Sequence, residues 1–147
     1  MSTETAADIL EIAQRRLMTQ PFSALLSAEI VEVGAGRCAL RVPIRDVLKQ
    51  QHGFVHGGVI SYAADNALTI AGFLAMDRAV VTSEFKVNYV RPAIGEAIIA
   101  RAECVHAGKS QAVCRCEVYV VTGGAEKLCA VAQGTIALLS GPEVPVN

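Results

Sequence analysis

Tryptophan is absent from this 147-residue sequence, and aromatic residues make up only 5% of it. Smaller side chains must therefore fill any core. Hydrophobic residues are 52% of the chain, which is enough to build a core and argues against disorder. The length corresponds to one domain, which we expect to span residues 1–147.

The sequence also has no large excess of positive or negative charge. The 13 basic and 14 acidic residues give a formal net charge of −1. No basic tract marks a surface for nucleic acid, so we expect no nucleic-acid partner. The N-terminus lacks the basic-then-apolar order of a signal peptide. Residues 57–76 have the length of a membrane span, but Asp65 lies in their middle, and a carboxylate in lipid is costly. We interpret this stretch as a buried helix and expect no membrane association.

The five cysteines are odd in number and show no CxxC spacing, which favours reduced thiols and a cytoplasmic protein. Cys114 and Cys116 lie two residues apart, so a strand would place both on one buried face. Cys104 and His106 make a weak pair of nucleophile and base, because the segment offers no third group to orient them.

Turn residues divide the chain into short elements. The expected elements are a helix at 5–18, strands at 28–33 and 37–42, a polar loop or short turn of helix at 44–54, a helix from 56 to about 76, and strands at 79–91, 97–107, 111–122 and 127–139. Closely spaced strands with glycine turns indicate an antiparallel sheet. The long helix is apolar almost all round and needs cover on most sides, which predicts an α+β domain with the sheet curled around it. We expect the tail at 141–147 to be frayed.

Asp65 is the most informative residue, because it is the only charged side chain between Gly57 and Met76. It could be an exposed residue, but its neighbours leave almost no charged face for it to belong to. Burying a carboxylate without a partner is expensive, which favours a functional reason for it. Ser61 and Thr69 lie four residues on either side, so they share its helix face and could donate hydrogen bonds to it.

Gly57 and Gly58 open the same helix. The first amides of a helix have no internal partner and lie at the positive end of its dipole. Without side chains, these amides can approach a carbonyl oxygen closely and stabilise an oxyanion, although an ordinary tight turn would use the same glycines. His56, just before them, could act as a base or simply bond to its own loop.

Spacing adds a constraint on these residues. Gly57 and Asp65 are eight residues apart, or about 12 Å along a helix axis. One chain's pair is therefore too far apart to act on one carbonyl carbon. If both residues are catalytic, a two-fold axis that packs two such helices antiparallel must bring Gly57 of one subunit near Asp65 of the other.

The run QQHGFVHGG from Gln50 to Gly58, followed by ADNA at 64–67, resembles the hotdog-fold acyl-CoA thioesterases, above all the PaaI-type and 4-hydroxybenzoyl-CoA thioesterases. A later F-x-V-x-Y-x-R-P segment, Phe85 to Pro92, is similar to the family's strand after the helix. The motif covers about 50–70, and the similar order of elements covers nearly the whole chain. The resemblance implies a hotdog fold and hydrolysis of an acyl- or aryl-CoA thioester. It also implies a homodimer or homotetramer that needs no metal or cofactor.

The resemblance implies a role for each matching residue. The implied catalytic set is Asp65, Gly57, Gln50, Ser83 and Thr69. Asp65 is the general base or nucleophile, the Gly57 N–H is the oxyanion donor, and Gln50 orients the thioester or water. Many relatives have Asn in place of Gln50, and Gln51 beside it could serve instead. Ser83 and Thr69 are hydroxyls that assist the acid. Gln50 and Gly57 would come from one subunit, and Asp65 and Ser83 from its partner.

Other residues are expected to contact the substrate. His56 and Gly58 border the oxyanion site, while Arg91 and Lys109 are candidates for CoA phosphates, with Arg45 and Lys49 as weaker ones. Arg91 and Lys109 could equally be solvated turn residues. Ser83 shares strand parity with Phe85, Val87 and Tyr89, so we expect it to face the helix, as a catalytic or a plain core hydroxyl.

Two other functions compete with hydrolysis. A hotdog hydratase or dehydratase also uses a histidine with an acid on the helix, but here the histidine directly precedes the glycines, and no proline-rich approach to the helix is present. A non-catalytic acyl-CoA-binding protein would use the same pocket, but it would normally need an output module, for which the chain has no room. Fold alone does not decide among them.

Overall fold

A computed structural model describes residues 4–140, so the predicted frayed tail at 141–147 lies outside the described residues. The helical elements are α1 (Ala6–Met18), α2 (Pro21–Leu25), a 3₁₀ turn η1 (Asp46–Leu48) and α3 (Gly57–Met76). The strands are β1 (Glu29–Gly34), β2 (Arg37–Pro43), β3 (Val80–Tyr89), β4 (Ala97–Ala107), β5 (Gln111–Thr122) and β6 (Ala125–Leu138).

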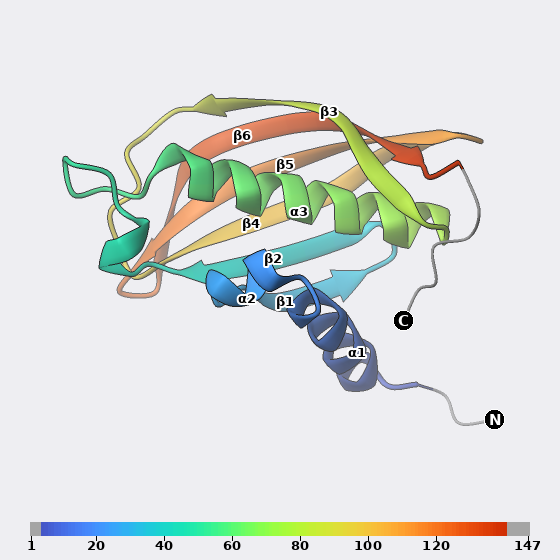
Figure 1. The fold of residues 1–147 in the computed structure, drawn as a ribbon, viewed down its shortest axis with the longest axis horizontal. Helices are drawn as coiled ribbons and strands as arrows, with labels where there is room; N and C mark the ends of the chain where they lie inside the picture. Colours follow the sequence, from blue (N-terminus) through green and yellow to red (C-terminus); the bar gives the residue numbers. More distant parts are fainter. Residues whose placement is uncertain (1–3, 141–147) are drawn as a thin grey trace.

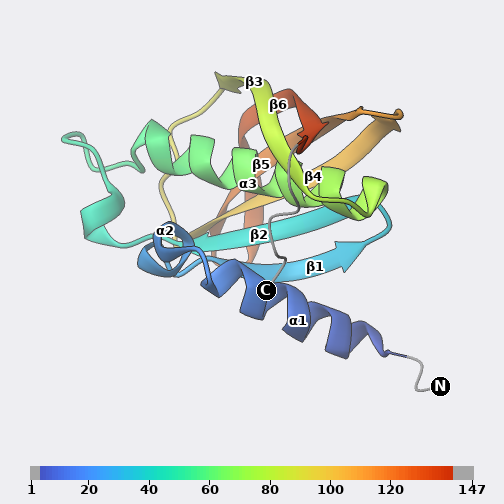
Figure 2. The same ribbon diagram turned by 45° about the vertical axis from the view of Figure 1, so that its right-hand side comes forward.

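The strands form one antiparallel sheet in the order β1-β2-β4-β5-β6-β3, and the sheet curves around α3 (Figure 1). α3 contacts β2, β3, β4, β5 and β6. This is the α+β hotdog architecture that the resemblance implies, and that prediction is confirmed. α1 lies outside the sheet, beside β1 (Figure 2).

α3 is long and apolar enough to cross a membrane, judged by length and composition alone. Its position shows that it is the core helix of the domain. Seven of its residues are buried: Ile60, Ala63, Ala64, Ala67, Leu68, Ala71 and Gly72. The four buried alanines have small side chains, which lets the helix lie close to the sheet. At Gly72, an added Cβ would lie 2.7 Å from Ile136 of β6. The prediction of a buried helix is confirmed.

The N-terminal region contains one helix more than predicted. The capping box of α1 is present, with Thr5 and Asp8 bonded to each other in both directions. Pro21, just beyond α1, occupies the first turn of the short helix α2. Proline suits that position, because its φ angle is already helical and the missing N–H would have no intrahelical partner there.

Candidate active site

Asp65 lies in the middle of α3, partly buried against β3. Thr82 Oγ1 donates a hydrogen bond to Asp65 Oδ1 at 2.7 Å. Thr69 Oγ1 donates to the main-chain oxygen of Asp65 at 2.8 Å and lies 2.7 Å from Thr82 Oγ1. None of the ion pairs within residues 4–140 includes Asp65. The carboxylate is thus oriented by a hydroxyl and is not neutralised by any cation in this described part of the chain.

The expected orientation of Ser83 is wrong. A β-bulge between Thr82 and Glu84 adds one residue to β3, so the alternation counted back from Phe85 fails at this point. Thr82 is partly buried and bonds to Asp65, whereas Ser83 is exposed. The hydroxyl beside the acid is therefore Thr82, which the sequence interpretation missed. A second hydroxyl residue next to Ser83 was the only signal of it, because alternation alone does not reveal a bulge.

The backbone N–H groups in the first turn of α3 differ in their hydrogen bonding. His56 Nδ1 accepts a hydrogen bond from the Gly58 N–H at 2.8 Å, which caps the helix and requires the unprotonated nitrogen. The Val59 N–H donates to the His56 carbonyl. In the described part of the chain, the Gly57 N–H has no hydrogen-bond partner. Of the two glycine amides, only that of Gly57 remains available for an oxyanion.

A cavity of about 360 Å³ lies beside this turn and brings together residues from three segments. Gln50, Gly57 and Arg91 line it, whereas Gln51 is exposed and does not. Tyr89 also lines it, a residue to which the sequence interpretation gave no role. Its only signal was its place in the F-x-V-x-Y-x-R-P segment. Ser61 does not reach Asp65, because its hydroxyl contacts Tyr89 Oη at 2.7 Å.

A polar cluster holds α2 against the outward side of α3, next to Asp65. Tyr62 Oη donates to Ser23 Oγ at 2.6 Å, and Asn66 Nδ2 donates to Tyr62 Oη at 3.0 Å. Ser23 Oγ also donates to Gln20 Oε1 at 2.8 Å, so its fully buried hydroxyl is satisfied. The cluster fixes the residue that follows the acid, and so it restrains the backbone at Asp65.

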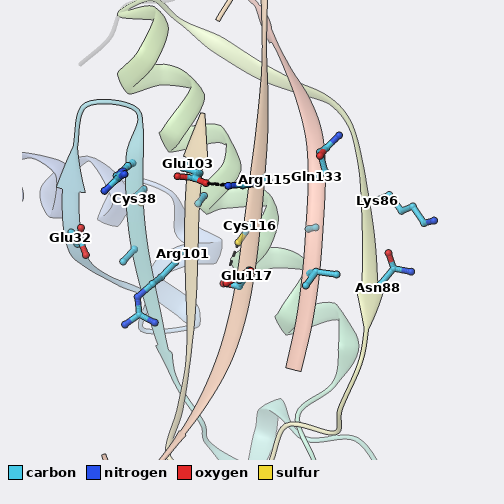
Figure 3. Close-up of a pocket in the computed structure, with 15 residues that line it drawn as sticks. Glu32, Cys38, Lys86, Asn88, Arg101, Glu103, Arg115, Cys116, Glu117 and Gln133 are labelled. Carbon is cyan, nitrogen blue, oxygen red and sulfur yellow. Dashed lines mark hydrogen bonds and ion pairs between the residues drawn. The ribbon is translucent and has the colours of Figure 1, made fainter. Parts of the chain in front are cut away.

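A larger cavity, of about 680 Å³, lies on the outer face of the sheet, with α3 behind the strands in Figure 3. Its side chains are largely paired. Arg115 and Glu103 form an ion pair at 2.6 Å, and Arg101 binds Glu126 with two hydrogen bonds. It contains no carboxylate or amide of the predicted set, so we do not regard it as the active site.

The cysteines do not supply a nucleophile. Burial raises the pKa of Cys38 and Cys116 to about 12, so both thiols stay protonated at neutral pH. Cys114 and Cys116 are both buried, as predicted. No hydrogen bond links Cys104 to His106 within residues 4–140, and His106 is exposed. No group of three or more potential metal ligands gathers in the same residues.

The family model of the thioesterase superfamily matches residues 52–127, more than half of the chain. The chain belongs to the thioesterase superfamily. The chain is 30% identical to a 1,4-dihydroxy-2-naphthoyl-CoA hydrolase of Listeria monocytogenes over 115 residues, which cover 77% of this chain and 91% of the relative. The predicted enzyme class, a thioester hydrolase, is confirmed.

Solved structures agree with this membership of the thioesterase superfamily. A thioesterase family protein from Silicibacter pomeroyi has a TM-score of 0.82 at 36% identity, over 92% of this chain and 100% of its own. The PaaI protein from the phenylacetic acid degradation operon of E. coli has a TM-score of 0.80 over 94% and 98% of the two chains. Its identity is 21%, so it shows a shared fold alone.

Two predicted residues of this thioesterase lie far from the first turn of α3. Asp65 is eight residues further along α3 than Gly57, or about 12 Å. Lys109 lies in the β4–β5 turn, at the end of the molecule opposite the start of α3 (Figure 1). A single chain therefore brings together Gln50, Gly57 and Arg91, but not Asp65 or Lys109.

Proposed function

We propose that this chain hydrolyses an acyl- or aryl-CoA thioester to the free acid and CoA, with Asp65 as general base or nucleophile and the Gly57 N–H as oxyanion donor. The observation that carries the proposal is the environment of Asp65. This carboxylate lies on the apolar core helix, its Oδ1 is held by Thr82, and no cation among residues 4–140 pairs with it. Such a group keeps a basic oxygen, Oδ2, for a proton of water or for the thioester carbon.

The steps balance without a metal or cofactor. In the base route, Asp65 takes a proton from water while the water oxygen bonds to the thioester carbon. The carbonyl oxygen becomes an oxyanion, and the Gly57 N–H at the positive end of α3 stabilises it. The C–S bond then breaks, and CoA leaves as a thiolate that takes up a proton. In the nucleophile route, an Asp65 carboxylate oxygen attacks the thioester carbon, and the C–S bond breaks as CoA leaves as a thiolate that takes up a proton. Water then hydrolyses the resulting anhydride to the free acid and the original Asp65 carboxylate.

The proposed site is shared between two subunits. The separation of about 12 Å along one helix prevents Gly57 and Asp65 of the same chain from acting on one carbon. A two-fold axis with antiparallel α3 helices would bring each Gly57 near the partner's acid. The outward face of α3 supports this arrangement. Although α2 covers Asn66, the neighbouring Asp65, Thr69 and Ile70 are only partly buried in the single chain, so a second copy has a face to cover.

Two observations support CoA as the leaving group. The Listeria relative is a CoA thioester hydrolase by name, and Arg91 lies at the rim of the cavity that Gly57 and Gln50 line. Arg91 is exposed and could bind a phosphate there. Lys109 could do so only from the partner subunit. We also propose that the protein is cytoplasmic, where CoA thioesters are available to it.

The test is release of free thiol from a panel of acyl- and aryl-CoAs by the wild type, by Asp65→Asn and by Asp77→Asn. We expect Asp65→Asn to lower kcat by about a hundredfold or more, since a lost general base costs ~10²–10⁴. Asp77→Asn is the matched control, because Asp77 is an exposed cap residue at the other end of α3 with a left-handed backbone that asparagine tolerates. It should leave kcat unchanged.

One result would refute the proposed reaction, and another would refute the role of Asp65 in it. No thiol release by the wild type from any substrate would exclude hydrolysis. Binding of intact acyl-CoA would then identify a non-catalytic binding protein, and water addition to an enoyl-CoA would identify a hydratase. Full activity of Asp65→Asn would leave thioester hydrolysis standing but remove Asp65 from it.

A further inference from the structure

The phenol of Tyr89 connects the end of β3 to the first turn of α3. Tyr89 Oη donates to the Gly57 carbonyl oxygen at 3.1 Å and lies 2.7 Å from Ser61 Oγ. These partners are 32 and 28 residues away in the sequence, so the contact ties two separate elements together. The contact is made to Gly57, the residue whose N–H has no hydrogen-bond partner within residues 4–140.

The ring of Tyr89 also lies against Gly57. A Cβ added at Gly57 would stand 3.3 Å from the ring and hydroxyl atoms, tighter than most such contacts. Tyr89 therefore occupies the space that a side chain at position 57 would need. The same ring lines the cavity of about 360 Å³, together with Gln50 and Gly57. About half of its surface, 52%, remains exposed.

Two adjacent glycines, Gly57 and Gly58, form the start of α3. Glycine loses more conformational freedom than any other residue when it is ordered, and the first turn of a helix has few internal hydrogen bonds. Two side chains offset this: His56 holds the Gly58 N–H, and Tyr89 holds the Gly57 carbonyl. An oxyanion donor acts only if it is fixed in place before the reaction.

We propose that Tyr89 is a positioning residue, which fixes Gly57 so that its N–H points at the developing oxyanion. The inference rests on the proposed function. Tyr89 acts through Gly57 and does not contact the reacting atoms, because its hydroxyl hydrogen is taken by the Gly57 carbonyl. Loss of its hydroxyl alone therefore lowers the rate of the chemical step and changes substrate binding little.

The experiment compares Tyr89→Phe with the wild type and with Tyr119→Phe. The phenylalanine keeps the ring over Gly57 and removes only the hydroxyl. Tyr119 supplies the control, because its hydroxyl bonds to Glu117 on the outer face of the sheet. We expect Tyr89→Phe to lower kcat for thiol release about five- to tenfold, with KM within about twofold and an unchanged melting temperature. Tyr119→Phe should change neither constant.

A second readout needs no activity. Backbone ¹⁵N relaxation should show a lower order parameter at Gly57 and Gly58 in Tyr89→Phe, and an unchanged one in the sheet. A kcat within about twofold of the wild type, or a loss confined to KM, would overturn the inference. So would unchanged order at both glycines. If the wild type releases no thiol, the proposed function fails, and the relaxation data alone decide whether Tyr89 holds this turn.

Discussion

Two adjacent residues of β3, Thr82 and Ser83, carry hydroxyl groups, and it is Thr82 that contacts Asp65. The bulge in β3 turns Thr82 toward the carboxylate and leaves Ser83 exposed. Thr82 is the donor to Oδ1, whereas Thr69 is bonded to the backbone of Asp65. Thr82 therefore sets the rotamer of the carboxylate, and its adjacent serine provides a matched comparison.

Removal of the hydroxyl group should lower kcat at Thr82 but not at Ser83. Thr82→Val keeps the shape of the side chain and removes the donor, so we expect kcat to fall about ten- to a hundredfold, the range of a hydrogen bond to a charged group. Thr82→Ser should retain most of the activity. Ser83→Ala should stay within about twofold of the wild type. Steady-state thiol release measures all three, and loss of activity in Ser83→Ala alone would return the role to Ser83.

At the scale of elements, the approach of α3 to β6 depends on one glycine. A Cβ at Gly72 would lie 2.7 to 3.0 Å from three atoms of Ile136, including its Cβ, so rotation of one side chain cannot relieve the contact. Overpacking of this kind costs about 1–3 kcal/mol, more than the roughly 1 kcal/mol that alanine gains over glycine in a helix. The helix would have to move away from the sheet.

We therefore expect Gly72→Ala to destabilise the protein by about 1–2 kcal/mol and to lower its melting temperature by several degrees. Gly34→Ala is the control. Gly34 has no atom within 4 Å of its added Cβ, so that variant should be as stable as the wild type or slightly more stable. Thermal unfolding measures both variants. Equal stability of the two would show that Gly72 is not a point of close packing.

The elements themselves could largely be predicted, because glycine turns and hydrophobic patterns are local signals. The strands at 97–107 and 111–122 have the predicted bounds, and the long helix begins at Gly57, one residue after its predicted start. α2 was missed because five residues are too few for a periodic pattern. The bulge in β3 was missed because it depends on pairing with β6, which no short stretch of sequence encodes.

At the scale of the whole molecule, the sequence could predict separate site residues but not which of them meet. The spacing of Gly57 and Asp65 along one helix already predicted that they are too far apart to act together. The meeting of Gln50, Gly57 and Tyr89 around one cavity depends on where the end of β3 lies relative to α3. That placement is a property of the folded sheet, and Tyr89 therefore had no role before the structure.

The proposed sharing of the active site predicts complementation between defective chains. A dimer of one Gln50→Ala chain and one Asp65→Asn chain would have one site with both residues intact and one with neither. Purified through two different affinity tags, this mixed dimer should show roughly half of the wild-type activity, far above either variant alone. If each site is built from one chain, both of its sites are damaged and no recovery occurs.

A reciprocal dimer distinguishes shared sites from sites that lie within one chain. One chain carries both Gln50→Ala and Asp65→Asn, and its partner is wild type. Shared sites would each contain one damaged residue, so this dimer should be nearly inactive, whereas sites within one chain would leave roughly half of the activity. Light scattering on the same preparations must give at least twice the chain mass of 15.5 kDa, because a monomer would exclude a shared site. The two dimers contain the same substitutions in total, so a difference in their thiol release can arise only from how the chains combine.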